Sequence, residues 1–120
     1  MPHILVVEDD DDLREAIQQI LIDRSFSVAA VRNGVEALAE ISNGPLPHCI
    51  VLDLMMPAFS GWEFLAELRA RDHFVRTPVL VASALAPPPD GIAVQGYIQK
   101  PFDADDFVRS VQQLIEVPAA

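Results

Sequence analysis

Cysteine and basic residues are scarce in this chain of 120 residues, and each shortage excludes a kind of protein. The single Cys49 cannot form an internal disulfide, and no set of cysteines and histidines has the spacing of a zinc site. Eight basic residues face eighteen acidic ones, for a formal net charge of -10. Because such a surface repels nucleic acid, we expect no direct binding to DNA or RNA.

Long hydrophobic runs are also missing. No stretch reaches the roughly 18 unbroken apolar residues of a membrane span, and the chain does not start with the charged and then apolar pattern of a secretory signal. Hydrophobic residues still make up 51% of the chain, which is enough to bury one core. We therefore expect a single cytoplasmic domain over residues 1–120, with no insertion into a membrane.

Apolar runs alternate with helical patterns along the chain. The predicted strands are His3–Val7, Phe26–Ala30, Cys49–Leu52, Pro78–Ala82 and Gly96–Gln99. Asn33, Ser60 and Asp103 are suited to begin helices, and Asn43–Gly44–Pro45 ends one of them. Alternating helices and continuously apolar strands predict a parallel sheet with helices on both faces.

Three consecutive prolines interrupt this alternation. Pro87–Pro88–Pro89 lies where the helix after the fourth predicted strand should begin. Because prolines cannot sit together inside a helix, only a turn or two fits into Asp90–Gln95. We expect the fourth helix to be shortened or replaced by a loop.

Residues with a carboxylate, hydroxyl or amine side chain follow four of the five predicted strands. Glu8 and Asp9 follow the first strand, Asp53 the third and Lys100 the fifth, and Ser83 stands at the end of the fourth. In an open parallel sheet, ligands bind beyond the carboxyl ends of the strands. Carboxylates, a hydroxyl and an amine are therefore expected at one edge of the sheet.

Each of these residues also has an explanation that involves no ligand. Acidic residues such as Asp10–Asp12 stabilise the positive end of a helix, and Asp53 could be a turn residue. Lys100 could be solvated, and Ser83 could bond to the backbone. Their joint occurrence favours a site, because clustered carboxylates repel one another unless a cation is present. Clusters of oxygen ligands suit Mg²⁺.

A carboxylate at such a site can act as a nucleophile and form an acyl phosphate. Phosphoryl transfer depends mainly on positioning and on neutralisation of charge, which Mg²⁺ and Lys100 would supply. Backbone amides after Asp53 and Ser83, among them those of Met55 and Ala84, could donate further hydrogen bonds. The residues thus predict Mg²⁺-dependent phosphorylation of Asp53.

Four segments together resemble the receiver domains of two-component response regulators. The resemblance runs from Ile4 to about Ile115, and its motifs appear in the family's order at strand ends. The segments are Ile4–Asp10, Val51–Pro57 with Gly61 following, Pro78–Ala84 and Tyr97–Phe102. Any single motif is weak, but all four in order are specific.

The resemblance implies a fold and a function. The fold would be flavodoxin-like, a doubly wound five-stranded parallel sheet of order 2-1-3-4-5. The domain would be a phosphorylated signalling protein rather than an enzyme. Asp53 would take its phosphoryl group from a histidine kinase or a histidine phosphotransfer protein. The modified domain would switch its binding to a downstream protein that the sequence does not identify.

The resemblance also assigns metal ligands. Asp9 and Asp53 would bind Mg²⁺ directly, Glu8 would bind it through water, and Met55 would contribute its backbone carbonyl. Mn²⁺ would be a possible substitute.

Further roles concern the phosphoryl group and the switch. Met55, Ser83, Ala84 and Lys100 would contact the phosphoryl group. Ser83 would move toward it, and Tyr97 would then turn inward. Pro101 would follow Lys100 through a cis peptide bond.

The sequence departs from the family pattern in three ways. The spacing from Ser83 to Lys100 is shorter than the family norm by somewhat more than one helical turn, which puts the usual output surface in doubt. Met55 and Leu85, two positions after Asp53 and Ser83, are apolar and cannot orient a hydrolytic water, so we expect slow self-dephosphorylation. The chain ends soon after the last predicted helix, so no output domain is expected.

Three other functions remain open on the sequence. The chain could be a degenerate receiver that signals without phosphate. A flavodoxin-like electron carrier would need a phosphate-cradling loop after the first strand, where Glu8–Asp12 would instead repel phosphate. A phosphatase with an aspartate nucleophile would place it after the first strand with a second aspartate two residues later. Asp53 instead follows the third strand, and Met55 stands two residues on.

Overall fold

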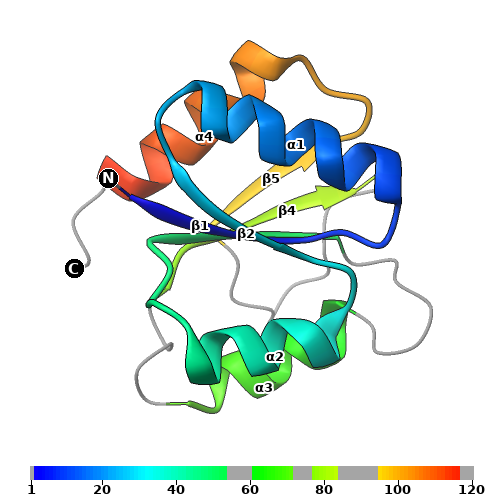
Figure 1. The fold of residues 1–120 in the computed structure, drawn as a ribbon, viewed down its shortest axis with the longest axis vertical. Coiled ribbons are helices and arrows are strands. Elements are labelled where there is room, and N and C mark those ends of the chain that lie inside the picture. Colours follow the sequence, from blue (N-terminus) through cyan, green and yellow to red (C-terminus); the bar gives the residue numbers. More distant parts are fainter. Residues whose placement is uncertain (1, 54–60, 72–76, 84–94, 117–120) are drawn as a thin grey trace.

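The computed structural model describes residues 2–53, 61–71, 77–83 and 95–116. Within these ranges, four helices cover a five-stranded sheet (Figure 1). The strands are β1 (His3–Val7), β2 (Ser27–Val31), β3 (Cys49–Leu52), β4 (Val79–Ser83) and β5 (Gly96–Gln99). The helices are α1 (Asp11–Asp23), α2 (Gly34–Asn43), α3 (Gly61–Arg69) and α4 (Ala104–Glu116).

The sheet is parallel throughout, with strand order β2-β1-β3-β4-β5. This confirms the predicted flavodoxin-like topology. Figure 1 shows α1 and α4 on one face of the sheet, and α2 and α3 on the other. None of the helices in the described ranges is long and apolar enough to cross a membrane.

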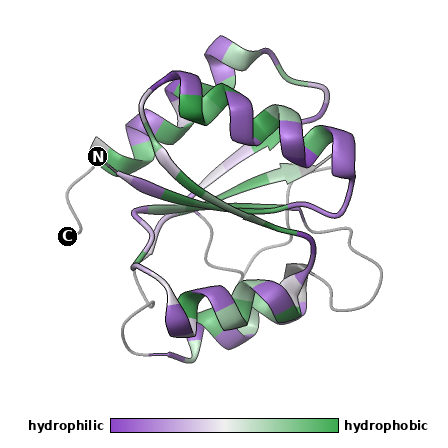
Figure 2. Ribbon diagram, in the orientation of Figure 1, coloured by the Kyte–Doolittle hydropathy of each residue, from purple (hydrophilic) through white to green (hydrophobic). Residues whose placement is uncertain are grey.

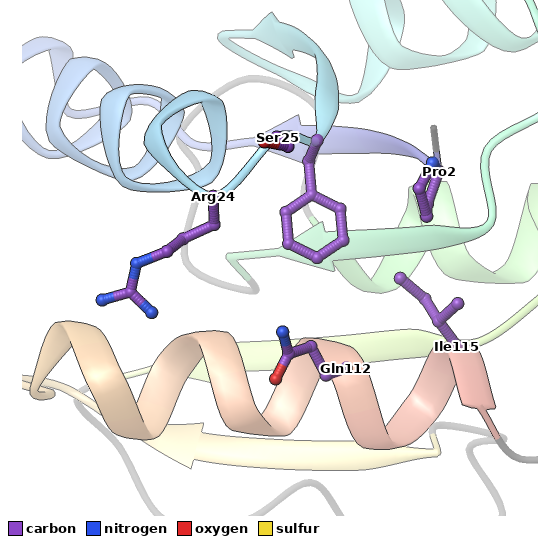
Figure 3. Close-up of a pocket in the computed structure, with 6 residues that line it drawn as sticks. Pro2, Arg24, Ser25, Gln112 and Ile115 are labelled. Carbon is purple, nitrogen blue, oxygen red and sulfur yellow. The ribbon is translucent and has the colours of Figure 1, made fainter.

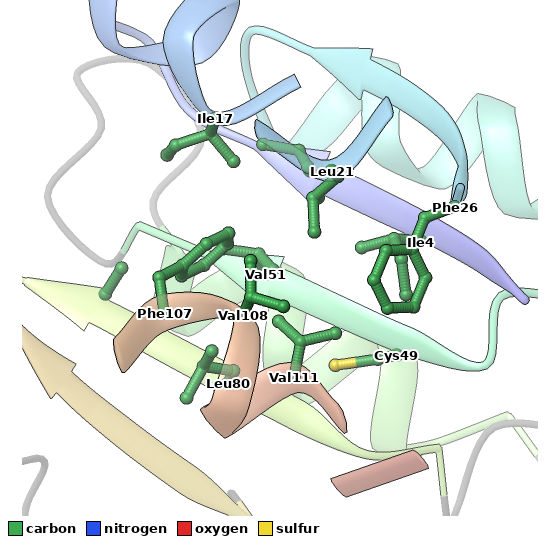
Figure 4. Close-up of a cluster of buried hydrophobic side chains, with 12 residues drawn as sticks. Ile4, Ile17, Leu21, Phe26, Cys49, Val51, Leu80, Phe107, Val108 and Val111 are labelled. Carbon is green, nitrogen blue, oxygen red and sulfur yellow. The ribbon is translucent and has the colours of Figure 1, made fainter. Parts of the chain in front are cut away.

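Two hydrophobic cores lie on the two faces of the sheet, and β1 contributes to both. Ile4 and Val6 belong to the core beneath α1 and α4 (Figure 4), whereas Leu5 and Val7 belong to the core above α2 and α3. Figure 2 shows mostly hydrophobic central strands and helices that combine hydrophobic with hydrophilic residues. A strand that is apolar on both faces is what a doubly covered parallel sheet requires.

The predicted helix boundaries are largely confirmed. The Asn33 side chain accepts a hydrogen bond of 2.9 Å from the Glu36 amide and caps α2. The backbone carbonyl of Asp103, which directly precedes α4, accepts a hydrogen bond of 2.9 Å from the Phe107 amide. The helix α2 ends just before Gly44, as predicted. The predicted start at Ser60 lies outside the described residues.

The connection between β4 and β5 is described only at its end, because residues 84–94 lie outside the described residues. The prediction of a shortened fourth helix falls on these residues. At the end of the connection, the Gln95 side chain accepts hydrogen bonds of 2.8 Å from the Val79 amide and from Arg69. Arg69 also donates to the Thr77 carbonyl at 2.8 Å. These bonds tie the end of α3 to the starts of β4 and β5.

The strand β2 begins at Ser27, one residue later than predicted, because the preceding residues complete the end of α1. The Phe26 amide donates to the Leu21 carbonyl at 3.1 Å, and the Ser25 amide donates to the Ile22 carbonyl at 3.0 Å. This pair of bonds is a Schellman motif, which places one residue in the left-handed region. That residue is Ser25, with a φ of 70°.

We expect Ser25→Gly to stabilise the fold by about 0.5–1 kcal/mol. The left-handed conformation costs a residue with a Cβ roughly 1–2 kcal/mol, and the greater freedom of glycine in the unfolded chain offsets part of the gain. Urea denaturation followed by circular dichroism measures the change. Ser110→Gly, inside α4, should instead lose about 0.5 kcal/mol. A lower free energy of unfolding for Ser25→Gly would show that the turn does not strain Ser25.

The buried Cys49 thiol provides a second check of the fold. Cys49 lies in β3 with no exposed surface, and burial raises the pKa of its thiol to about 12. We expect no reaction with a chromogenic thiol reagent at neutral pH in the folded protein, and complete reaction in denaturant. Fast labelling of the native protein would be incompatible with this placement of β3.

Candidate functional site

The carboxyl ends of β1 and β3 bring acidic residues together. Val7 pairs with Leu52, so the residues that follow, Glu8 and Asp53, leave the sheet side by side. The Asp53 amide donates to the Val7 carbonyl at 3.0 Å and thereby fixes this arrangement. Ligand oxygens of Glu8, Asp9 and Asp53 all lie within 4.8 Å of one another. The structure thus unites the three carboxylates that the sequence singled out.

Lys100 comes to the same place from the end of β5. Its Nζ lies 2.6 Å from Oε1 of Glu8 and 3.5 Å from Oδ2 of Asp53. Glu8 is only 2% exposed and Asp53 only 5%, so both carboxylates have lost most of their contact with water. A buried charge needs a partner, and Lys100 is the cation that meets both.

One lysine does not fully compensate this cluster. Burial raises the pKa of Glu8 to about 7, although its hydrogen bonds to Lys100 and to the Asp10 amide favour the charged form. Burial also acts to lower the pKa of Lys100, but Glu8 and Asp53 outweigh it, and the net shift is upward. The charged form of Glu8 is therefore disfavoured in this site, and a further cation would stabilise that form.

The donor set fits Mg²⁺. All three candidate side chains are carboxylates, and Mg²⁺ prefers oxygen ligands, of which proteins typically supply one or two carboxylates. Asp9 is more exposed than Glu8 and Asp53, which leaves one side of the cluster open to water. Within the described part of the chain, this is the group of side chains suited to hold a metal ion.

The turn between β1 and α1 carries two of these carboxylates, and α1 holds it. The Asp10 side chain caps α1 by accepting from the Leu13 amide at 2.9 Å. Arg14 donates to the Glu8 carbonyl at 3.1 Å. The sequence did not indicate Arg14 as a site residue, because nothing in its position distinguishes it from other surface arginines.

The remaining predicted residues are described only in part. Ser83 ends β4 opposite Gln99, so its backbone lies at the same edge of the sheet, but its side chain lies outside the described residues. Met55, Ala84 and Leu85 lie outside them altogether. Their predicted roles stay predictions.

Two predicted residues on and after β5 are described. Tyr97 is half-buried and packs against the core of α2 and α3. The peptide bond between Lys100 and Pro101 is cis, the form that the resemblance implies.

A separate hollow of about 290 Å³ lies at the start of β1, at the opposite end of that strand from Glu8 (Figure 3). Phe26 and Ile115 give it apolar walls. Arg24 reaches its rim but is paired with Asp105 at 2.7 Å. The described residues that line this hollow include no carboxylate, so what is described of it does not share the chemistry of the acidic site.

A doubly wound parallel sheet with buried carboxylates and a lysine at its carboxyl edge defines an α/β domain with an acidic cluster that could hold a metal ion. The family model for the response regulator receiver domain matches residues 4–112. The chain belongs to this family, and it is a signalling domain of the two-component type.

Individual relatives agree with this assignment. The probable transcriptional regulator ycf29 of Porphyra purpurea is 35% identical over 118 residues, which cover 94% of this chain and 56% of that protein. The receiver domain of a Pseudomonas aeruginosa PAO1 sensor histidine kinase has a TM-score of 0.88 and 25% identity, covering 97% of this chain and 98% of that one. It was solved with a magnesium ion coordinated in its active site cleft.

A further solved structure, the response regulator TrrA from Thermotoga maritima, has a TM-score of 0.83 and 27% identity, covering 95% of this chain and 99% of that one. It was solved in complex with Mg(2+)-BeF. Several curated relatives are about twice as long as the matched region, so the chain spans about half of their length.

Proposed function

We propose that Asp53 accepts a phosphoryl group from a histidine kinase or a histidine phosphotransfer protein, and that the modified domain changes its binding to another protein. The observation that carries this proposal is the convergence of Glu8, Asp9 and Asp53 within 4.8 Å, with Lys100 3.5 Å from Asp53. A lone acid at a strand end would not need such surroundings. A carboxylate that acts as the nucleophile in phosphoryl transfer needs neighbouring groups that neutralise charge and hold the phosphoryl group in position.

The reaction would proceed by direct displacement. An Asp53 carboxylate oxygen forms a bond to phosphorus, the bond from phosphorus to the donor's imidazole nitrogen breaks, and the imidazole keeps the electron pair. Lys100 is placed to pair with the phosphoryl oxygens, and to do so it must give up its 2.6 Å contact with Glu8. Bound Mg²⁺ would supply the remaining neutralisation of charge.

The metal would be held by this chain's own oxygens. Asp9 and Asp53 would be direct ligands, Glu8 would act through water, and the Met55 carbonyl would complete the protein's share. The open side at Asp9 and the magnesium ion in the related Pseudomonas structure support this assignment. Replacement by Mn²⁺ stays a prediction, as do the cytoplasmic location and the absence of nucleic-acid binding.

The experiment is to incubate the purified protein with acetyl phosphate and Mg²⁺ and to measure its intact mass. The wild type should gain a single phosphate, and Asp53→Asn or removal of Mg²⁺ by a chelator should abolish the gain. Asp106→Asn, an exposed change on α4, serves as the matched control and should be phosphorylated normally. No adduct with any donor would favour the degenerate receiver, and a yellow protein would favour a flavin carrier.

We expect the phosphorylated protein to lose its phosphate slowly. In such domains the side chains two positions after the phosphorylated aspartate and the switch hydroxyl flank the path of the attacking water, and here these positions hold Met55 and Leu85, which carry no group that can orient it. Polar substitutions such as Met55→Asn should speed the loss, measured by intact mass over time in Mg²⁺. Rapid loss from the wild type that polar residues at these positions leave unchanged would contradict the expectation.

A further inference from the structure

Arg14 reaches from the first turns of α1 back over the turn that carries Glu8 and Asp9. Its Nη1 donates to the Glu8 backbone carbonyl at 3.1 Å, and its Nη2 pairs with Oδ1 of Asp11 at 2.6 Å. Only 18% of the side chain is exposed. The guanidinium thus joins the end of β1 to the first residue of α1 through two hydrogen bonds.

With the hydrogen bond from Arg14, both backbone groups of Glu8 have a partner. On one side, the Glu8 amide donates to the Val31 carbonyl of β2 at 3.0 Å. On the other, its carbonyl is held by Arg14. With both backbone groups bonded, the direction in which the Glu8 side chain leaves the sheet is set, and so is the start of the turn that places Asp9.

We propose that Arg14 is a positioning residue for the divalent-cation site, acting through the backbone of Glu8 rather than on the cation. The inference rests on the proposed function in one respect, namely that this site binds Mg²⁺. Partners that orient metal ligands typically contribute 10- to about 100-fold to metal affinity. Removal of Arg14 should therefore weaken Mg²⁺ binding.

The chain contains a matched pair that shows what an ordinary surface arginine looks like. Arg109 and Asp106 have the same spacing on α4 and are 3.0 Å apart, but their side chains are 65% and 60% exposed. The Arg109 guanidinium donates to Asp106, three residues before it on the same helix. A pair of this kind contributes little to stability and nothing to a distant site.

Positioning and simple electrostatics predict opposite results at Arg14. A positive charge near a cation site disfavours a second cation, so neutralising Arg14 would tighten Mg²⁺ binding if charge alone mattered. If Arg14 instead holds the ligands in place, its loss weakens binding despite the removed repulsion. The sign of the change therefore decides between the two roles.

The test is calorimetric titration of the metal-free full chain with MgCl₂ at constant ionic strength. We expect Arg14→Ala to bind about tenfold more weakly than the wild type. Arg14→Lys, which keeps the charge and can make one of the two bonds, should lie between them, about threefold weaker. Arg109→Ala should bind like the wild type. Urea unfolding without the cation shows whether each variant is folded.

The outcomes separate this inference from the proposed function. No Mg²⁺ binding by the wild type would sink the proposed function and this inference with it. Wild-type binding together with equal or tighter binding by Arg14→Ala would overturn the positioning role alone. If Arg14→Ala does not fold without the cation, Arg14→Lys decides: about threefold weaker binding supports the role, and wild-type or tighter binding rejects it.

Discussion

Lys100→Met should bind Mg²⁺ about tenfold more tightly than the wild type and still take up phosphate about a hundredfold more slowly. In the structure, Lys100 is the counter-ion of Glu8 and Asp53, at 2.6 and 3.5 Å. Removing it takes away the positive charge that competes with Mg²⁺ for these two carboxylates, so the affinity for Mg²⁺ should rise. The phosphoryl group, however, loses the positive charge that Lys100 would bring to its oxygens.

Two measurements on one preparation check this pair of effects. Calorimetry gives the Mg²⁺ affinity, and intact mass after exposure to acetyl phosphate gives the rate. Lys100 is the only lysine in the sequence, so Arg24→Met, which removes an exposed pair with Asp105, is the nearest control and should change neither quantity. Weaker Mg²⁺ binding by Lys100→Met would mean that the lysine organises the carboxylates instead of competing for them.

Phe107→Ala should lower the free energy of unfolding by about 3–5 kcal/mol, a large share of the roughly 5–15 kcal/mol that a domain of this kind possesses. Phe107 is fully buried between α4 and the sheet, and its ring stacks on Phe102 with centroids 5.0 Å apart. The truncation removes apolar contacts and leaves a cavity that the surrounding strands cannot fill.

Urea denaturation followed by far-ultraviolet circular dichroism measures this loss. Phe102 is only half-buried, so Phe102→Ala should cost much less, about 1 kcal/mol. If both substitutions lowered the free energy of unfolding equally, Phe107 would not be packed in the hydrophobic core as Figure 4 shows.

The topology could be predicted because the apolar pattern leaves little choice. Strands such as β3 are apolar on both faces, which only a doubly covered parallel sheet satisfies, and the carboxyl ends of such strands share one edge. The convergence of Glu8, Asp9, Asp53 and Lys100 follows from that geometry. Two strands differ from the prediction by one residue at each end: β4 spans Val79–Ser83 instead of Pro78–Ala82, and β2 spans Ser27–Val31 instead of Phe26–Ala30. For β2, the cause is a backbone hydrogen bond of Phe26 to Leu21 that no residue pattern indicates.

The pairing within the site could not be predicted from the sequence. Strand ends indicate which residues meet, but not that Lys100 is closer to Glu8 than to Asp53, since burial and side-chain reach decide this. The same holds for Arg14, whose contact to a backbone carbonyl depends on the folded turn. The bond of Gln95 to Arg69 likewise joins segments 26 residues apart with no motif at either end.

The most direct measurement of the central claim is to locate the phosphate on the chain. Protein treated with acetyl phosphate and Mg²⁺ is reduced with borohydride, which converts an aspartyl phosphate to homoserine, and its peptides are sequenced by mass spectrometry. Homoserine at position 53, and at no other position, is the predicted result. Phosphate on a histidine or on another aspartate, with Asp53 unchanged, would contradict the account.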